Sequence, residues 1–173
     1  METIYFNKPG FEEFRFLSNF WISNQTVDNI LYQTNEHYYQ AKKCAEQEYH
    51  DYVANLPKAA DTRTVGGLFV SKRRQKAITW LRKNYPDWDL DTEERWCSFQ
   101  LVDDFHNGVN EEIMLTGLRA KFLPGTQLGE NLKMLKGFRI VEWSPWDNYW
   151  GSGPDGNGKN RLGELLMVVY NEL

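Results

Sequence analysis

Apolar residues recur at helical spacing in several parts of the chain. Near the C-terminus, Leu162, Leu165, Leu166 and Val169 follow the i, i+3, i+4, i+7 pattern of a helix that buries one face. Other stretches show similar spacing between residues that start or stop helices. The predicted helices cover Glu36–Leu56, Ser71–Asn84, Glu111–Phe122, Leu128–Leu135 and Asn160–Leu173.

Short polar side chains precede two of these helices and can accept the unpaired N–H groups of a first turn. Thr34 or Asn35 can cap the first helix, and Asn110 can cap the helix that begins at Glu111. A further helix is predicted after the run Asp91–Glu94, which resembles a capping box. Its buried face would carry residues at i, i+4 and i+8, namely Cys97, Leu101 and Phe105.

Strand signals are few and short. Residues 1–34 mix aromatic residues with turn formers such as Asp28–Asn29, which predicts short strands and loops. Gly137–Trp143 has strand composition and leads into a glycine-rich loop. The expected fold class is therefore α+β, mostly helical, in a compact single domain with a few short strands that spans residues 1–173.

Composition narrows the function classes. The 173 residues include 10 Phe, 9 Tyr and 7 Trp, enough rings to fill a core, and the rings gather in residues 1–39 and 138–150. The formal net charge is −4, so the chain lacks the overall basic field of a sequence-tolerant nucleic-acid binder. Any contact with nucleic acid must then be local, and the oligomeric state is not predicted.

Other features exclude whole classes of site. No apolar run approaches the roughly 18 residues of a membrane span, and no secretory signal is present, so we expect no membrane partner. Cys44 and Cys97 are interpreted as free thiols of a cytoplasmic protein. The three histidines lack the spacing of a zinc site, so we expect neither a metal nor a cofactor.

Two segments could carry chemistry. On the first predicted helix, Glu36, Gln40 and Lys43 fall on one narrow polar stripe. The stripe is either an exposed face with weak side-chain pairing or a carboxylate beside an amide and an amine, suited to acid–base or imine chemistry. The sequence alone leaves both open.

The second segment runs from Trp146 to Gly163. Its glycines match the dinucleotide pattern G-x-G-x-x-G, but only one terminal helix follows, so a Rossmann fingerprint is rejected. Lys159, Asn160 and Arg161 at a helix N-terminus favour a phosphate, although a plain glycine-rich turn explains the composition as well.

Two further signals are weaker. Lys72–Lys76 is a basic run in an acidic protein, and it is either a solvated helix face or a contact for a nucleic-acid backbone. Leu118–Phe122 contains Arg119, an arginine that could face a site.

Four strings in chain order carry a family resemblance: Phe16–Phe20, Asn35–Lys43, Leu118–Phe122, and Asp147–Gly151 continued by Asn160–Met167. Together they resemble the NADAR family over essentially the whole chain. This family includes N-glycosidases of riboflavin-biosynthesis intermediates and enzymes that remove ADP-ribose from guanine. The segment Tyr85–His106 is longer and more aromatic than we expect for the shortest members of the family, a difference that bears on the choice of substrate.

The resemblance implies roles for particular residues. Glu36 would be the catalytic carboxylate, Lys43 the lysine of the family pattern, and Asp147 part of the catalytic set. Our hypothesis is that Lys43 attacks the ring-opened sugar and forms a transient imine. The resemblance also implies a set of substrate-binding residues: Ser18, Asn19, Phe20, Gln40, Arg119, Tyr149, Trp150, Gly151, Gly153, Gly156, Gly158, Lys159 and Asn160.

The implied activity is hydrolysis of a bond between a ribose carbon and a nitrogen of a base. The first substrate expected is ADP-ribosylated guanine, free or within nucleic acid. One alternative is hydrolysis of the phosphorylated ribosylamino-pyrimidines of riboflavin synthesis. A different class also stays open, a module that binds ADP-ribose without cleaving it.

Overall fold

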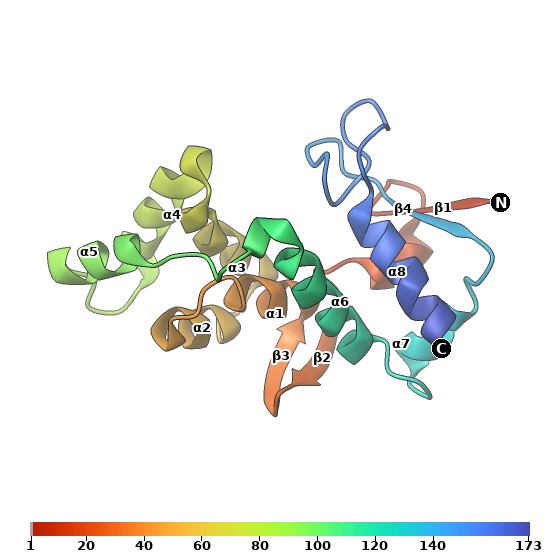
Figure 1. The fold of residues 1–173 in the computed structure, drawn as a ribbon, viewed down its shortest axis with the longest axis horizontal. Helices are drawn as coiled ribbons and strands as arrows, with labels where there is room; N and C mark the ends of the chain where they lie inside the picture. Colours follow the sequence, from red (N-terminus) through yellow and green to blue (C-terminus); the bar gives the residue numbers. More distant parts are fainter. Residues whose placement is uncertain (1) are drawn as a thin grey trace.

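Two short two-stranded sheets lie among helices in the computed structural model, which describes residues 2–173 (Figure 1). In the first sheet, β1 (Thr3–Phe6) pairs in parallel with β4 (Arg139–Glu142). In the second, β2 (Ile22–Val27) and β3 (Ile30–Thr34) form an antiparallel hairpin. Its turn residues, Asp28 and Asn29, both have positive φ, a conformation that Asp and Asn tolerate. The short N-terminal strands and the strand expected within Gly137–Trp143 are therefore confirmed.

Helices make up most of the described chain. They are α1 (Asn35–Ala41), α2 (Gln47–Ala54), α3 (Ala59–Val65), α4 (Ser71–Asn84), α5 (Leu90–Ser98), α6 (Val109–Lys121), α7 (Gln127–Lys133) and α8 (Arg161–Glu172). Three short 3-10 turns cover Glu12–Leu17, Gly66–Phe69 and Phe105–Asn107. The expected fold class, a mostly helical α+β single domain, is confirmed. None of the helices within residues 2–173 has the length and apolar character needed to cross a bilayer.

The long helix predicted over Glu36–Leu56 is wrong, because the chain forms α1 and α2 with a break between them. The start is confirmed: Thr34 Oγ1 accepts the N–H of His37 at 3.2 Å. The break follows from tertiary pairing that local sequence does not encode. Lys43 O accepts the N–H of Val102 at 2.8 Å, and Cys44 forms an isolated β-bridge with Leu101.

The helix predicted after Asp91 is also corrected. Asp89 caps α5, with its Oδ1 accepting the N–H of Thr92 at 2.8 Å, and the helix ends at Ser98. Leu101 and Phe105 therefore lie beyond the helix. Trp96, not its neighbour Cys97, is the fully buried residue of this helix, because other large rings pack around it.

Two smaller differences concern helix starts. Gly108, in the left-handed conformation, occupies the cap position of α6. Asn110, the predicted cap, lies inside the helix, and its Oδ1 accepts only the N–H of the next residue, Glu111. The helix α3 was not predicted, because its sequence Ala59–Val65 lacks an apolar stripe.

The core has two parts, which meet at α1. The first, called the helical core, is built on α2, α4 and α5 and includes Tyr49, Val53, Leu81 and Trp96. The second, called the sheet core, packs α6 and α8 near β1 and β4 and includes Phe6, Leu118, Ile140 and Leu166. Figure 1 shows α2, α4 and α5 at one end and α8, β1 and β4 at the other, with α1 and α6 between them. Since Tyr38 packs in the first core and Tyr39 in the second, the polar residues of α1 lie at the junction.

Candidate active site

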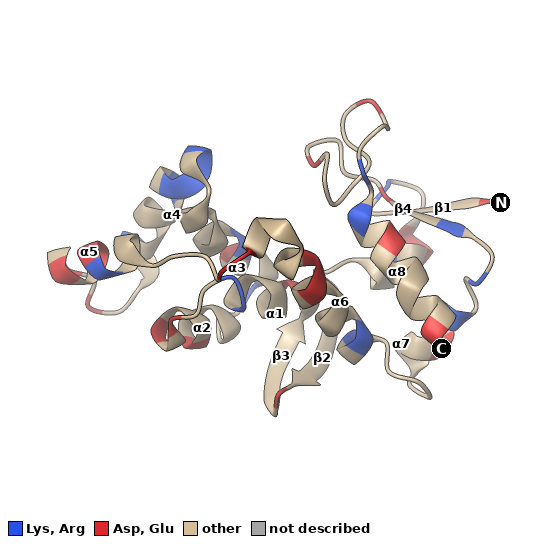
Figure 2. Cartoon of the chain, in the orientation of Figure 1, with Lys and Arg blue, Asp and Glu red and all other residues tan. Residues whose placement is uncertain are grey.

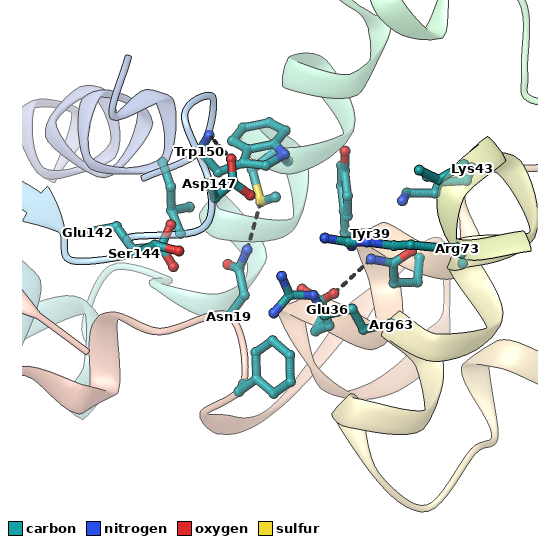
Figure 3. A pocket seen from close by; sticks show the side chains of 17 residues that line it. Asn19, Glu36, Tyr39, Lys43, Arg63, Arg73, Glu142, Ser144, Asp147 and Trp150 are labelled. Atoms are coloured by element: carbon teal, nitrogen blue, oxygen red, sulfur yellow. Dashed lines mark hydrogen bonds between the residues drawn. The ribbon is translucent and has the colours of Figure 1, made fainter. Parts of the chain in front are cut away.

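A cavity of about 200 Å³ lies at this junction (Figure 3). Its floor is α1, and two walls face each other across it. The basic wall comprises Arg63 of α3 and Arg73 of α4; the acidic wall comprises Glu142, Ser144 and Asp147 at the end of β4 and in the loop that follows. The full lining is Asn19, Phe20, Glu36, Tyr39, Gln40, Lys43, Arg63, Gly66, Gly67, Val70, Arg73, Met114, Glu142, Ser144, Asp147, Trp150 and Leu162.

Glu36 lies in the first turn of α1 and is buried, with 6% of its surface exposed. Gln40, one turn later, donates from Nε2 to Glu36 Oε1 at 2.7 Å. Burial raises the pKa of Glu36, while the Gln40 hydrogen bond and the charge of Lys43 oppose that rise. The carboxyl is thus a buried acid–base group whose orientation is fixed by its own helix.

Gln40 can reach Glu36 because a glycine faces it. A Cβ added to Gly66 would stand 1.9 Å from Gln40 Oε1, which no side chain could tolerate without moving Gln40. The same Oε1 is buried and accepts no hydrogen bond from any residue in the described range 2–173. It is therefore a buried acceptor that packs against Gly66 without a hydrogen bond, while Nε2 of the same amide holds Glu36.

Lys43 lies two residues beyond the end of α1 and still lines the cavity. Its Nζ is 5.1 Å from the centroid of the Tyr39 ring and 5.8 Å from that of Phe105. Burial lowers the pKa of Lys43 to about 8, although the charge of Glu36 favours the protonated form. A fraction of the amine is consequently neutral near pH 7, as a nucleophile requires.

On the acidic wall, Glu142 is the last residue of β4. Its carboxylate accepts a hydrogen bond from Asn7 Nδ2 at 3.2 Å. Burial raises the pKa of Glu142 to about 7, and the charges of Asp147 and Glu36 add to the rise. A carboxyl of this kind exchanges its proton near neutral pH.

Asp147 shapes the loop of the acidic wall. Its Oδ1 accepts the N–H groups of both Tyr149 and Trp150 at 2.9 Å, an Asx turn. This turn places the indole of Trp150 edge-on to the Tyr39 ring, with 5.6 Å between centroids. Trp150 and Tyr39 thereby form an aromatic corner of the cavity.

The two arginines of the basic wall come from separate helices. Neither guanidinium has a hydrogen bond or ion pair with another side chain in the part of the chain that the structure describes. Arg73 belongs to the basic run on α4, where Lys and Arg gather (Figure 2). Two uncompensated cations beside a cavity favour an anionic ligand such as a phosphate ester.

The remaining edge is formed by Asn19 and Phe20. Asn19 is buried, accepts a hydrogen bond from Asn35 Nδ2 at 2.9 Å and donates to the sulfur of Met114 at 3.3 Å. Phe20 is 39% exposed at the mouth. Ser18 lies just outside the lining, and its carbonyl oxygen accepts a 2.6 Å hydrogen bond from the buried Lys121. Ser18 thus fixes the segment that presents Asn19 and Phe20.

The structure brings together seven of the predicted site residues: Asn19, Phe20, Glu36, Gln40, Lys43, Asp147 and Trp150. Two others lie elsewhere. Arg119 is at the surface, where it forms a two-pronged ion pair with Glu172 at 2.8 and 2.5 Å. Tyr149 lines a neighbouring cavity, and its hydroxyl donates to Glu111 at 2.6 Å.

The glycine-rich loop does not form the expected phosphate cradle. The backbone N–H groups of Gly158, Asn160 and Arg161 donate to carbonyl oxygens of Ser152, Gly151 and Tyr149 at 2.7, 3.1 and 3.0 Å. These N–H groups, which were expected to bind a phosphate, are therefore hydrogen-bonded within the loop. The expected binding residues Gly151, Gly153, Gly156, Gly158, Lys159 and Asn160 all lie outside the cavity lining.

Close packing explains why this loop needs glycine and asparagine. A Cβ on Gly158 would lie 2.3 Å from the carbonyl oxygen of Gly151. The side chain of Asn160 accepts the N–H of Glu142 at 2.9 Å and donates to Ile140 O at 2.8 Å. Asn160 thus joins the start of α8 to β4 and supports the strand that carries Glu142 of the acidic wall.

Sequence reasoning missed Arg63, Arg73 and Glu142 as site residues. Arg73 was part of the basic run noted on α4, and Glu142 lay inside the predicted strand. Arg63 had no local signal, because its position depends on how α3 packs against α1. Among residues 2–173, no cluster of three or more His, Cys, Asp or Glu side chains has the arrangement of a metal site.

Comparison with known proteins decides the family. The family model of the NADAR domain matches residues 5–173. This chain belongs to the NADAR family. The N-glycosidase YbiA of Escherichia coli is 31% identical over 156 residues, which are 90% of this chain and 79% of that protein. An N-glycosidase of Nostoc punctiforme is 30% identical over 171 residues, 99% of this chain and 92% of its own length.

The fold is also similar to a solved NADAR-family structure. The NMR structure of Escherichia coli YbiA aligns with a TM-score of 0.73 at 27% identity, covering 99% of this chain and 84% of the other. The relatives named above are N-glycosidases, hydrolases that act on N-glycosyl bonds, so the expected enzyme class is confirmed at that level.

A relative with a different name matches only in part of its length. A riboflavin biosynthesis protein of Vibrio vulnificus is 30% identical over 172 residues, or 99% of this chain. The NADAR chain described here spans 39% of that longer protein.

Proposed function

We propose that this NADAR domain hydrolyses the bond between the anomeric carbon of a phosphorylated ribose and a nitrogen of a base. One observation carries the proposal: a buried carboxyl, Glu36, and a half-buried amine, Lys43, face one cavity beside two arginines that have no side-chain partner within residues 2–173. The arginines suit the phosphate, and the carboxyl and amine suit the reacting carbon.

Glu36, when ionised, stabilises positive charge that develops on the anomeric carbon as the base departs. Gln40 keeps that carboxylate oriented through its 2.7 Å hydrogen bond. Lys43, in its neutral form, adds to the same carbon and forms an imine with the ring-opened sugar, and water then releases the sugar and restores the amine. Asp147 acts through the loop: it positions Trp150.

The first substrate we propose is ADP-ribosylated guanine, free or within nucleic acid. A second cavity of about 300 Å³ adjoins the first and shares Tyr39, Lys43, Val70 and Trp150 with it. Its other walls include the rings of Phe69 and Phe105. A site of two connected cavities, one charged and one aromatic, suits a ligand with two nucleoside-like halves.

The second candidate is a phosphorylated ribosylamino-pyrimidine of riboflavin synthesis. The name of the Vibrio vulnificus relative favours it, and the charged cavity alone offers groups for one ribose phosphate. A third candidate, an ADP-ribose-binding module without activity, is less well supported, since binding needs neither the buried carboxyl of Glu36 nor the amine of Lys43.

Incubation of the purified chain with an ADP-ribosylated guanine oligonucleotide and with the ribosylamino-pyrimidine phosphate separates these candidates. Release of free base from either substrate identifies it, and Glu36→Gln should lower that release. Arg119→Ala, a surface variant outside the cavity, serves as the control that keeps full activity. Tight binding of ADP-ribose with no product from either substrate would replace the proposal by the binding module.

A further inference from the structure

Two carboxyl side chains that lie far apart in the sequence line the same cavity, one on its floor and one on its acidic wall. Glu36 stands on α1 beside Gln40, whereas Glu142 stands at the end of β4 on the acidic wall (Figure 3). Hydrolysis of a bond from ribose to nitrogen needs two such roles. One group stabilises the cationic carbon, and another supplies a proton to the departing nitrogen.

The position of Glu142 is fixed by contacts from three separate segments. Asn160 Oδ1 accepts its backbone N–H at 2.9 Å, and its carbonyl oxygen accepts the N–H of Ser152 at 2.9 Å. Asn7 donates to Oε1 at 3.2 Å. Within residues 2–173, Oε2 has no hydrogen-bond partner, so this oxygen is available to a ligand in the cavity.

The other carboxyls of the cavity are less suited to give a proton. Oδ1 of Asp147 already accepts two backbone N–H groups, so this carboxyl is engaged in fixing the loop. Glu36 accepts from Gln40 and is adjacent to the charge of Lys43, which suits a charge stabiliser. We propose that Glu142 is the general acid that protonates the departing base nitrogen. This inference rests on the N-glycosidase activity proposed above.

The step balances as follows. The bond between the anomeric carbon and nitrogen breaks, its electron pair stays on nitrogen, and Glu142 transfers its proton to that nitrogen. In the hydrolytic half of the reaction, a water molecule adds to the anomeric carbon of the enzyme-bound sugar and gives a proton to the Glu142 carboxylate. The carboxyl is thereby restored, and the net reaction consumes one water.

The surroundings of Glu142 agree with this role. Asp147 and Glu36 present negative charge, Arg63 presents positive charge, and burial dominates, so the pKa of Glu142 rises to about 7. Lys43 and Arg73 also line the cavity. Near neutral pH a large share of Glu142 is thus protonated and able to donate.

The test uses two substrates that share ADP-ribose and differ in the leaving group. In ADP-ribosylated guanine, the departing nitrogen needs a proton. In nicotinamide adenine dinucleotide, the pyridinium nitrogen leaves as a neutral ring and needs none. Glu142→Gln should slow release of guanine on the order of 10²–10³-fold and change release of nicotinamide by less than about threefold.

The matched control is Glu130→Gln, an exposed glutamate on α7, which should leave both rates unchanged. The pH profile of guanine release supplies a second readout. It tests whether Glu142 is the general acid even if the wild type does not cleave the dinucleotide. Its alkaline limb, where Glu142 loses its proton, should vanish from the residual activity of Glu142→Gln.

The outcomes are distinguishable. If the wild-type protein releases base from neither guanine nor pyrimidine substrate, the proposed function fails. If the wild type releases base, three results would show that Glu142 is not the acid. Glu142→Gln could release guanine at a similar rate, could release guanine and nicotinamide with equally reduced rates, or could keep the alkaline limb of the pH profile.

Discussion

The acidic and basic walls of the cavity are built in different ways. The acidic wall is one continuous segment, from Glu142 to Trp150, held by hydrogen bonds to its own loop and to Asn160. The basic wall consists of single arginines, Arg63 and Arg73, contributed by different helices. The acidic wall is held by hydrogen bonds to its backbone, and the basic wall depends on how helices pack.

This difference explains what each wall can do. Hydrogen bonds fix the atoms of the acidic wall, as proton transfer requires. Within residues 2–173 the two arginine side chains have no side-chain partner, so they can adjust to an anion, since a phosphate accepts hydrogen bonds from a range of directions. We therefore expect changes at the acidic wall and floor to affect turnover, and changes at the basic wall to affect binding.

The largest effect is expected from loss of the amine at the floor. Lys43→Met should lower base release on the order of 10³-fold, because no covalent adduct can then form. Borohydride added during turnover should trap a sugar adduct on the wild-type protein, detectable by mass, and none on the variant. Failure to trap an adduct with active wild-type protein would remove the imine from the mechanism.

A smaller loss should follow from crowding Gln40. Gly66→Ala places a methyl group where Gln40 Oε1 now lies, so Gln40 must release Glu36. We expect kcat to fall about tenfold to a hundredfold, with KM changed little. The control is Gly137→Ala, outside the cavity, which has open space at its Cβ but a strained positive φ that Gly66 lacks, so it shows how much kcat falls from backbone strain alone. Unchanged kcat in Gly66→Ala would show that Gln40 does not orient Glu36.

The basic wall should respond through KM. Arg73→Ala should raise KM for a phosphorylated substrate about tenfold, the loss of one charge-assisted contact, and leave kcat nearly unchanged. Lys72→Ala, next to it on α4 and exposed, is the control for net charge. Equal increases in KM for the two substitutions would mean that the electrostatic field of α4, and not a direct contact of Arg73, binds the substrate.

The smallest effect is on stability, and its sign depends on pH. The pKa of Glu142 is raised from 4.5 to about 7 in the folded protein, so its stabilising protonated form is lost as pH rises through 7. The unfolding free energy of Glu142→Gln minus that of the wild type should therefore be about 1–3 kcal/mol larger at pH 8 than at pH 4.5. Urea unfolding at both pH values measures this, and a pH-independent difference would contradict the burial of Glu142.

Much of the site could be predicted where local sequence encodes it. Thr34 caps α1, which puts Glu36 and Gln40 on one face, and the string around Asp147 carries the loop. The contribution of Arg63 could not be predicted, because it depends on the packing of α3 against α1. The pairing inside the glycine-rich loop could not be predicted for a related reason: the N–H groups expected to bind a phosphate donate to carbonyl oxygens of the folded loop.

The roles of the aromatic residues also depend on tertiary packing. Two of the rings from the aromatic-rich residues 1–39 and 138–150, Tyr39 and Trp150, meet at the cavity. Another group of rings, which packs around Trp96, fills the helical core instead. Whether a ring lines a cavity or fills a core depends on tertiary neighbours, which ring content does not encode.

The central claim is that the cavity between the two walls cleaves a bond from ribose to a base nitrogen. Its most direct test compares release of free base by the wild-type protein and by Glu36→Gln, with circular dichroism to confirm equal folding. We predict release from ADP-ribosylated guanine or from the ribosylamino-pyrimidine phosphate by the wild type, and a rate at least about a hundredfold lower in the variant. No release by the wild type, or equal release by both proteins, would contradict the account.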